Sequence, residues 1–370
     1  MTTAIILLAI ICLAYANGAN DNFKGVATLF GSGTTNYRGA LVWATITTFL
    51  GSLTAVFLAG KLLQSFSGKG LVADSLAADP HYAAAVALGA GLTVFLAARI
   101  GMPISTTHSL LGALVGAGFA AGSTIDVTKL AGSIFMPLLV SPVVAMGVTA
   151  VCYPLLHRAR RGFGVTEQTC FCVGSETVEV LPALSHAAAL QRVEHLSMQV
   201  GDAVTCENRY QGRVLGVQVS AILDRLHYLS AGMVSYARGL NDTPKIAGLL
   251  LLAPQLGGFA GTSLVGVAIA LGGLLSARKV AETMSEKITH MNHGQGLTAN
   301  LVTGVIVIGA SNLGLPVSTT HVSCGALFGI GTVTRQGHAS MMGKILGAWF
   351  TTLPLAAALG AASLWAIRCL

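Results

Sequence analysis

The chain has 370 residues, of which 53% are hydrophobic and only 9% are charged. Soluble globular domains carry about 25% charged residues, so this composition excludes a water-exposed surface and predicts a polytopic membrane protein. The formal net charge of +7 fits membrane proteins that gather Lys and Arg in cytoplasmic loops. The sequence has no long basic run with interleaved aromatic residues, so it does not indicate a nucleic-acid-binding protein.

Residues 3–32 predict a first span that is interrupted in its middle. The polar run Asn17–Asn22, followed by Lys24, lies inside an otherwise apolar stretch. A charged side chain at mid-bilayer costs about 2.5–3.5 kcal/mol, so we expect a broken helix whose gap faces protein or water. No Lys or Arg precedes this stretch, which argues against a signal peptide and for an uncleaved span.

The remainder of the first transmembrane repeat, residues 1–156, contains further apolar stretches. A clean span is expected over 39–60. Residues 82–101 and a helix from Pro103 to about Gly122 are separated by Gly101-Met102-Pro103. A long stretch over 128–156 ends at the basic cluster 157–161.

Residues 157–224 are rich in charged side chains and predict a small soluble insert. Alternation of apolar and polar residues at Thr177–Val180 and Arg213–Val219 predicts short strands. The basic cluster at its start predicts a cytoplasmic location. Cys170 and Cys172 form a C-x-C pair, which lacks the spacing typical of a zinc site.

The second transmembrane repeat, residues 225–370, follows the same order as the first. We expect a break around Asn241-Asp242 within 226–256, a glycine-rich span over 257–277 and a polar loop over 278–293. Two segments, 296–314 and 316–334, flank a second proline motif, and a last span covers 342–367.

Two motifs occur once in each half. Pro103-Ile104-Ser105-Thr106-Thr107-His108 recurs as Pro316-Val317-Ser318-Thr319-Thr320-His321, and Tyr15-Ala16-x-Gly18-x-Asn20-Asp21-x-x-Lys24 recurs as Tyr236-Ala237-x-Gly239-x-Asn241-Asp242-x-x-Lys245. Each half predicts an odd number of crossings, so the second copy is inverted. The expected fold is therefore all-α and polytopic, with two inverted-topology repeats, broken helices, re-entrant hairpins and a small cytoplasmic insert.

The hydroxyl groups after each proline are candidate anion ligands. A helix start presents free backbone N–H groups with partial positive charge, which bind anions. Two such starts from opposite sides could hold a small oxyanion, although ordinary helix capping also explains these residue types. The candidate substrate ligands are Asn20, Ser105, Thr106, Thr107, Asn241, Ser318, Thr319 and Thr320.

The ionisable residues of the motifs are candidates for a coupling ion. Asp21 and Asp242 either bind a cation such as sodium, carry a proton, or pair with Lys24 and Lys245 at i,i+3 spacing. Asn20 and Asn241 suit either a cation or an anion. The two motif histidines are either satisfied core residues or proton carriers, and they are His108 and His321.

Gly18-Ala19-Asn20-Asp21 and Gly239-Leu240-Asn241-Asp242, each followed by Pro-x-Ser-Thr-Thr-His, resemble the inorganic phosphate transporter (PiT) family. The resemblance implies a phosphate symporter coupled to sodium or protons, with phosphate between the hairpin tips, and a homodimer. The family signature Gly-Ala-Asn-Asp-Val-Ala-Asn-Ala has Asn where this chain has Lys24 and Lys245. We therefore hypothesise that at least one sodium site is missing and that protons drive transport.

Three alternatives accompany this interpretation. A sulfate permease of the same family is an alternative because some similar bacterial proteins carry sulfate, and because Lys24 and Lys245 can neutralise the carboxylates that would repel it. An anion channel is a weaker alternative. An intramembrane enzyme needs one copy of its active site, whereas both copies of the motif are kept here. The expected location is the cytoplasmic membrane, with no cofactor other than a sodium ion at Asp21 or Asp242.

Overall fold

The computed structural model describes residues 2–58, 60–66, 70–166, 169–180, 191–202, 214–252 and 258–369. The chain forms two compact units. One contains Met1–Tyr153 together with His227–Leu370, and we call it the membrane unit. The other contains Pro154–Leu226 and covers the segment that was predicted as an insert.

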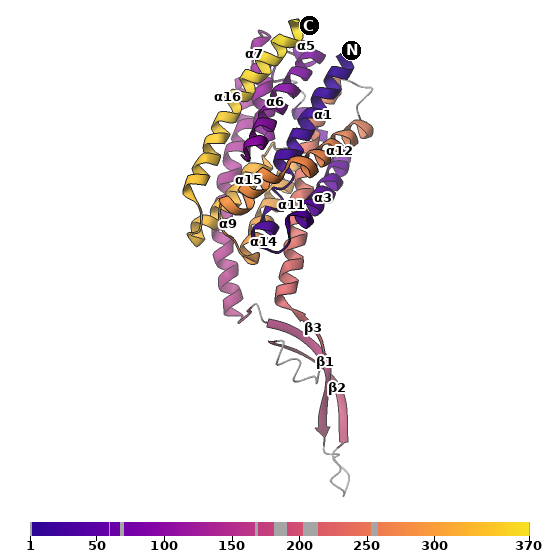
Figure 1. Ribbon diagram of the computed structural model, residues 1–370, viewed down its shortest axis with the longest axis vertical. Coiled ribbons are helices and arrows are strands. Elements are labelled where there is room, and N and C mark those ends of the chain that lie inside the picture. The colour runs from indigo at the N-terminus through magenta and orange to yellow at the C-terminus, as the bar shows by residue number, and fades with distance from the viewer. Residues whose placement is uncertain are drawn as a thin grey trace. The chain divides into compact units, whose positions relative to one another are not determined.

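The first half of the membrane unit consists of long helices joined by short helices and turns (Figure 1). The helices are α1 (Thr2–Asp21), α2 (Ala27–Gly31), α3 (Tyr37–Leu58), α4 (Gly60–Ser65), α5 (Asp74–Ala77), α6 (Pro80–Ile100), α7 (Thr106–Ala120) and α8 (Val127–Lys129). A π-helical segment, η1 (Leu130–Phe135), continues into α9 (Met136–Gly162), which leaves the membrane unit.

The second half repeats this order of long and short helices. Its elements are α11 (Val219–Ala247), the 3₁₀ segment η2 (Gly248–Leu252), α12 (Gly258–Ser276), α13 (Arg278–Glu282), the π-helical η4 (Thr283–Lys287), α14 (His293–Asn312), α15 (Thr319–Thr334) and α16 (Ala339–Cys369). Within the described residues, seven helical stretches are long and apolar enough to cross a membrane. This confirms the predicted all-α polytopic class.

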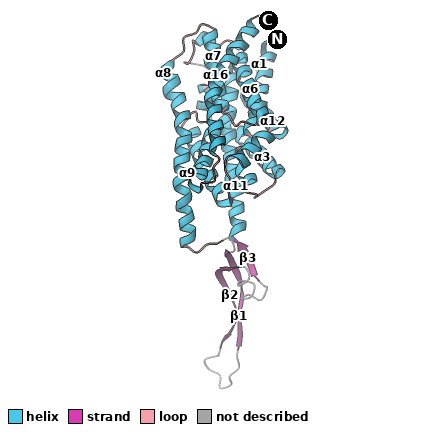
Figure 2. Ribbon diagram, turned by 60° about the vertical axis from the view of Figure 1, so that its left-hand side comes forward, coloured by secondary structure: helices cyan, strands magenta, loops and turns pink. Residues whose placement is uncertain are grey.

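The smaller unit contains an antiparallel sheet of three strands in the order β2-β1-β3 (Figure 2). The strands are β1 (Thr169–Val180), β2 (Gln191–Asp202) and β3 (Val214–Gln218). The alternating pattern located β1 and β3 but missed β2. Strand β2 is antiparallel to β1, and its Glu194 pairs with Thr177 of β1. Cys170 is a buried free thiol, whereas Cys172 is disulfide-bonded, so this C-x-C pair is not a pair of free thiolates.

The two halves differ at their Asn-Asp motifs, and one predicted break is wrong. Helix α1 ends at Asp21 and is followed by turns up to Val26, as expected. Helix α11 instead continues through Asn241-Asp242 and Pro244 as far as Ala247. The two copies therefore share their polar residues but differ in backbone structure.

Helices α1 and α11 run in opposite directions within the membrane unit. The start of α1, at Ile6, and the end of α11, at Ile246, belong to the same apolar cluster, and Figure 1 shows the chain termini at this end. Antiparallel corresponding helices are what an inverted repeat predicts.

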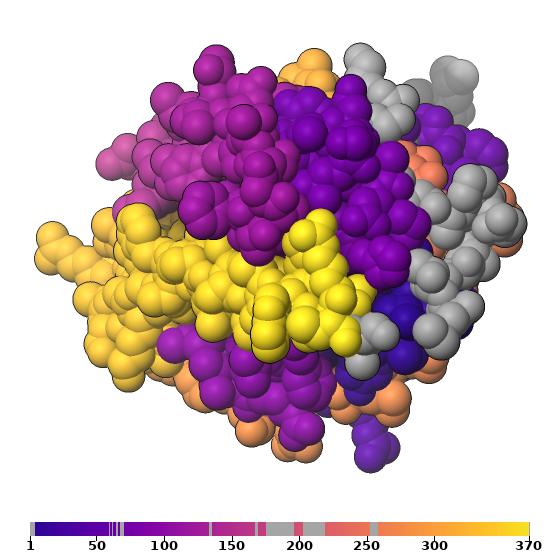
Figure 3. All heavy atoms as spheres, turned by 90° about the horizontal axis from the view of Figure 1, so that it is seen from above, coloured from indigo at the N-terminus to yellow at the C-terminus, as the bar shows by residue number. Residues whose placement is uncertain are grey.

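Small residues allow the central helices to pack closely. A side chain at Gly272 of α12 would collide with the backbone of Tyr15 in α1, and one at Gly116 of α7 with the backbone of Ala357 in α16. Figure 3 shows the yellow atoms of α16 lying against the purple and magenta atoms of the first half. Close approach through small residues is typical of helices packed within a membrane.

Candidate functional site

The starts of α7 and α15 meet in the interior of the membrane unit. Ser105 caps α7 by accepting a hydrogen bond from the His108 N–H at 3.1 Å, and Ser318 caps α15 by accepting one from the His321 N–H at 3.2 Å. The serines thus have the capping role. The neighbouring threonines face a cluster of buried charges, and we call this the central cluster: Asn17, Asp21, Lys24, Arg238, Asp242 and Lys245 with Thr106, Thr107, Thr319 and Thr320.

Lys24 is the most completely coordinated residue of the central cluster. Its ammonium donates to Asp21 Oδ1 at 2.5 Å and to Asn20 Oδ1 at 2.7 Å. It also lies 2.8 Å from the carbonyl oxygen of Ile104 and 2.6 Å from Thr320 Oγ1. With only 2% exposure, the charge is satisfied entirely by protein oxygens, as a buried ammonium requires.

Lys245 repeats this arrangement with the halves exchanged. Its ammonium donates to the carbonyl oxygen of Val317 at 2.7 Å, to Thr107 Oγ1 at 2.9 Å and to Asp242 Oδ1 at 3.5 Å. Each lysine therefore bonds the loop of its own half and a threonine of the other half. The predicted i,i+3 pairs form, and each lysine also joins the two helix starts.

The two carboxylates receive the remaining threonine hydroxyls. Thr106 Oγ1 donates to Asp21 Oδ2 at 3.2 Å, and Thr319 Oγ1 donates to Asp242 Oδ2 at 3.5 Å. Asn17 links both sides, because its amide nitrogen lies 3.1 Å from Asp21 Oδ2 and 3.5 Å from Asp242 Oδ2. Asp21 is thus held by shorter contacts than Asp242.

Asn20 and Asn241 hold the proline loops in place. The Asn20 amide donates to the carbonyl oxygen of Met102 at 2.9 Å, and its side-chain oxygen accepts from the Ile104 N–H at 3.2 Å. The Asn241 amide donates to the carbonyl oxygen of Val317 at 3.1 Å. In this structure, therefore, the two asparagines bind backbone, and their predicted role as substrate ligands stays a prediction.

Arg238 is a third buried cation, which the sequence analysis missed. It is 1% exposed, and its Nη2 donates to Asn17 Oδ1 at 2.8 Å while Nη1 donates to Asn22 Oδ1 at 3.1 Å. Asn17 occupies the equivalent position in the first motif, so the repeat does not reproduce this charge. The signal that could have revealed it is an arginine inside an apolar segment, four residues before Asp242.

His108 and His321 lie beside each other just behind the two helix starts. Their ring centroids are 4.5 Å apart, and the His321 ring stacks on Trp349 of α16 at 3.8 Å. His321 Nδ1 lies 3.4 Å from the carbonyl oxygen of Leu138, whereas His108 Nδ1 and His321 Nε2 are buried without a hydrogen-bond partner. Unpartnered buried nitrogens of this kind leave a proton-handling role open.

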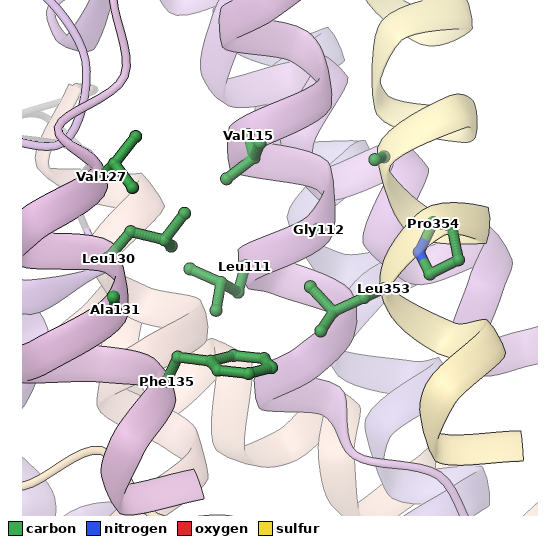
Figure 4. Close-up of a pocket in the computed structure, with 10 residues that line it drawn as sticks. Leu111, Gly112, Val115, Val127, Leu130, Ala131, Phe135, Leu353 and Pro354 are labelled. Atoms are coloured by element: carbon green, nitrogen blue, oxygen red, sulfur yellow. The ribbon is translucent and has the colours of Figure 1, made fainter. Parts of the chain in front are cut away.

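A cavity elsewhere in the membrane unit is unsuitable for an anion. It has a volume of about 370 Å³ and lies between α7, the α8–η1 segment and α16 (Figure 4). Its lining has no ionisable side chain and consists of Leu111, Gly112, Val115, Val127, Leu130, Ala131, Phe135, Leu353, Pro354 and Ala357. This cavity therefore offers no ionisable group to an anion.

Comparison with known proteins identifies the family. A model of the phosphate transporter family matches residues 17–360, which include the whole central cluster. The chain belongs to the phosphate transporter family. Membership makes it a transporter and not an enzyme, and it confirms the family that the two motifs indicated.

Relatives of this phosphate transporter family member align along nearly its whole length. A protein of Pyrococcus abyssi that is named as a phosphate permease is 28% identical, over 95% of this chain and 94% of the relative. The chloroplastic inorganic phosphate transporter 2-1 of Arabidopsis thaliana is 26% identical, over 95% of this chain and 70% of the relative. A solved structure titled as the sodium-dependent phosphate transporter matches with a TM-score of 0.76 at 22% identity, covering 100% of this chain and 99% of that one, which shows the fold.

The contacts of Asp21 and Lys24 predict strong coupling between these two residues. Asp21→Asn leaves the buried Lys24 ammonium without its carboxylate and should lower stability by about 3–5 kcal/mol. Lys24→Met should cost less, because Asp21 keeps its hydrogen bonds from Asn17 and Thr106. The double variant removes both charges and should recover most of the loss. Thermal unfolding of the detergent-solubilised protein measures all three.

Glu282→Gln is the matched control for this double-mutant cycle. It breaks an exposed i,i+4 pair with Arg278, whose Nε lies 3.2 Å from Glu282 Oε1, and should cost less than about 1 kcal/mol. Additive losses in the Asp21 and Lys24 double variant would contradict the assignment of this ion pair.

Proposed function

We propose that this family member is a secondary active transporter of inorganic phosphate, with the anion bound between the starts of α7 and α15. The meeting of the two helix starts carries the proposal. It brings two sets of backbone N–H groups and four threonine hydroxyls to one buried place, which is a setting that favours an oxyanion. Membership of the phosphate transporter family supports phosphate as that oxyanion.

The threonines provide a way to pass the anion from one side to the other. Thr320 of the second half contacts Lys24 of the first, and Thr107 of the first half contacts Lys245 of the second. In alternating access, one repeat rocks against the other around a fixed midplane site. These crossed contacts are the ones that such a movement must break and remake.

We propose further that protons, rather than sodium, are the coupling ions. Unwound carbonyl oxygens and the C-terminal ends of half-helices hold the coupling ion in several inverted-repeat transporters. Here the candidate oxygens of Asp21, Asn20, Ile104 and Thr320 all accept hydrogen bonds from the Lys24 ammonium. A sodium ion does not fit this oxygen set while Lys24 is present, so we derive no step through sodium.

Lys245 blocks the second candidate sodium position in the same way. It occupies the carbonyl oxygen of Val317 and the hydroxyl of Thr107. The groups left to carry a proton are Asp242, which has long contacts, and the histidine pair. Phosphate itself carries one proton more in its monovalent form than in its divalent form, so the anion and this extra proton can move together.

Uptake by proteoliposomes tests this coupling. In sodium-free buffer, an acidic exterior should stimulate uptake of labelled phosphate by the wild-type protein, and adding sodium should change it by less than about twofold. The physical reason is that the ammonium groups fill the oxygen positions of a coupling cation. A strict sodium requirement that ignores the pH gradient would refute the proposal.

Lys24→Asn and Lys245→Asn are the diagnostic variants for the same assay, because they restore the asparagine of the family signature. Each variant opens an oxygen-lined position and should lose sodium-free uptake, and added sodium should recover part of it. Lys279→Asn is the control, since this lysine is exposed and donates to the carbonyl oxygen of Arg99 at the surface. It should transport as the wild type does.

Sulfate and channel-like flux are separated by two further readings of that assay. A sulfate permease would let unlabelled sulfate compete with phosphate at equal concentration. A channel would show no acceleration of labelled uptake by phosphate inside the vesicle.

We also propose a homodimer, because members of the family that this chain resembles are expected to be dimeric.

We propose that the protein resides in the cytoplasmic membrane with the smaller unit in the cytoplasm. Basic residues gather at the end of the membrane unit that carries Thr34 and Tyr153, near His227 and Gln295. They include Arg38, Arg99, Arg278 and Lys279, whereas the opposite end carries Asp74, Asp79 and Asp126. A basic excess marks the cytoplasmic side, while a disulfide at Cys172 is more typical of oxidising compartments.

Limited proteolysis decides between these two indications. Trypsin added outside intact cells or right-side-out vesicles should leave the smaller unit uncut, because its basic start at Arg158–Arg161 faces the interior. Trypsin added to inside-out vesicles should cut there. Cleavage of the smaller unit from the outside, with the vesicle lumen sealed, would place it on the other face.

A further inference from the structure

The central cluster contains an excess of one positive charge. Among the described residues, Lys24, Lys245 and Arg238 are its buried cations, and Asp21 and Asp242 are its buried carboxylates. The other titratable groups packed against it are His108, His321 and Cys324, and a proton on either histidine would only increase the excess. A lone charge at this depth is costly, so the cluster is one negative charge short.

The excess charge coincides with an unused donor. The Nε–H of Arg238 is buried and has no hydrogen-bond partner, which is costly for a buried guanidinium. The nearest carboxylate oxygen, Asp242 Oδ2, lies 3.7 Å away. That oxygen is also 3.5 Å from both Thr319 Oγ1 and the Asn17 amide nitrogen, so Asp242 Oδ2 has only long contacts, whereas Oδ1 accepts a hydrogen bond from the Asn241 amide at 3.2 Å.

The Arg238 Nε–H lies close to the starts of α7 and α15. Arg238 Nη2 bonds Asn17 Oδ1 at 2.8 Å, and the Asn17 amide nitrogen lies 3.0 Å from Thr106 Oγ1 at the start of α7. The Asn17 side chain therefore lies between the Arg238 guanidinium and Thr106, and the Asp242 side chain lies between the guanidinium and Thr319. A small anion that displaced Asp242 from Thr319 would reach the Nε–H as well.

We infer that Arg238 selects the charge of the transported anion: the site takes a tetrahedral oxyanion with a single negative charge, which for phosphate is dihydrogen phosphate. This inference rests on the proposed function and specifies its substrate. A monovalent anion neutralises the cluster, whereas a divalent anion leaves a net negative charge unless a proton enters with it. Guanidinium is suited to this role because it stays ionised and matches the geometry of an oxyanion.

The same charge relation distinguishes phosphate from sulfate. Hydrogen phosphate reaches the monovalent state by taking one proton near neutral pH, whereas sulfate stays divalent. Sulfate therefore binds only if a residue such as Asp242 or a histidine is protonated for it. Asn17 is the residue of the first motif that corresponds to Arg238 in the second. Because Asn17 is neutral, the central cluster has one excess positive charge and not two.

Equilibrium binding of labelled inorganic phosphate to the solubilised full chain tests the inference. Between pH 6 and pH 9, the wild-type dissociation constant for total phosphate should rise by about tenfold per pH unit once the monovalent form becomes the minor species. Sulfate at the same concentration should displace little. Arg238→Gln should weaken phosphate binding by about tenfold or more at pH 6, and Arg238→Lys should retain more binding because it keeps the charge.

Arg278→Gln is the matched control, because it removes an arginine charge that is 79% exposed in its side chain. It should bind phosphate as the wild type does. Wild-type binding that does not change with pH, equal competition by sulfate, or full binding by Arg238→Gln would each overturn the inference. If the wild type bound no phosphate at any pH, the proposed function itself would fail.

Folding of the Arg238 variants is followed by thermal unfolding in parallel. If Arg238→Gln does not fold, the pH series and the sulfate competition on the wild type still decide the question. A wild type that transports phosphate but binds both charge forms equally would refute the selection by charge and leave the transport function intact.

Discussion

The burial of opposite charges between two helix starts is the constraint on which the rest of the structure depends. Lys24 and Asp21 are 2% and 1% exposed, and the ammonium is satisfied by four oxygens. A charge so far from water must find its partners in the protein. The end of α1, the proline loop before α7 and Thr320 at the start of α15 together supply those partners.

This constraint also ties the two halves of the membrane unit together. The lysine of each half contacts a threonine of the other half, so neither lysine finds all of its hydrogen-bond partners within its own half. In the proposed transport cycle, an anion that binds between the helix starts must compete directly with contacts that hold the halves together.

The ammonium groups explain how the proposed coupling differs from that of a sodium-driven relative. The solved structure with the same fold is titled as sodium-dependent, but the oxygens around Lys24 and Lys245 already bind a positive charge here. A tethered cation cannot leave the site. In the proposed mechanism the energy for transport comes from protons instead, and the groups that support this proposal are the two histidines with unpartnered ring nitrogens and Asp242.

The sequence predicted the parts of this site that occur twice. Repetition identified the proline loops, and the i,i+3 spacing identified both lysine–aspartate pairs. Arg238 was missed because it has no copy at Asn17, and because its hydrogen-bond partners lie far from it in the sequence, at Asn17, Asn22 and Thr48. The continuation of α11 through Asn241 was missed because a polar pair in an apolar segment predicts burial of charge but does not decide whether the helix ends there.

An experimental structure of the protein with phosphate, determined without sodium, tests the central claim most directly. We predict phosphate between the starts of α7 and α15, within hydrogen-bond distance of Arg238 Nε, with the ammonium of Lys24 still held by Asp21 and the carbonyl oxygen of Ile104. Phosphate bound away from both helix starts, or lysines turned out of their oxygen positions, would contradict it.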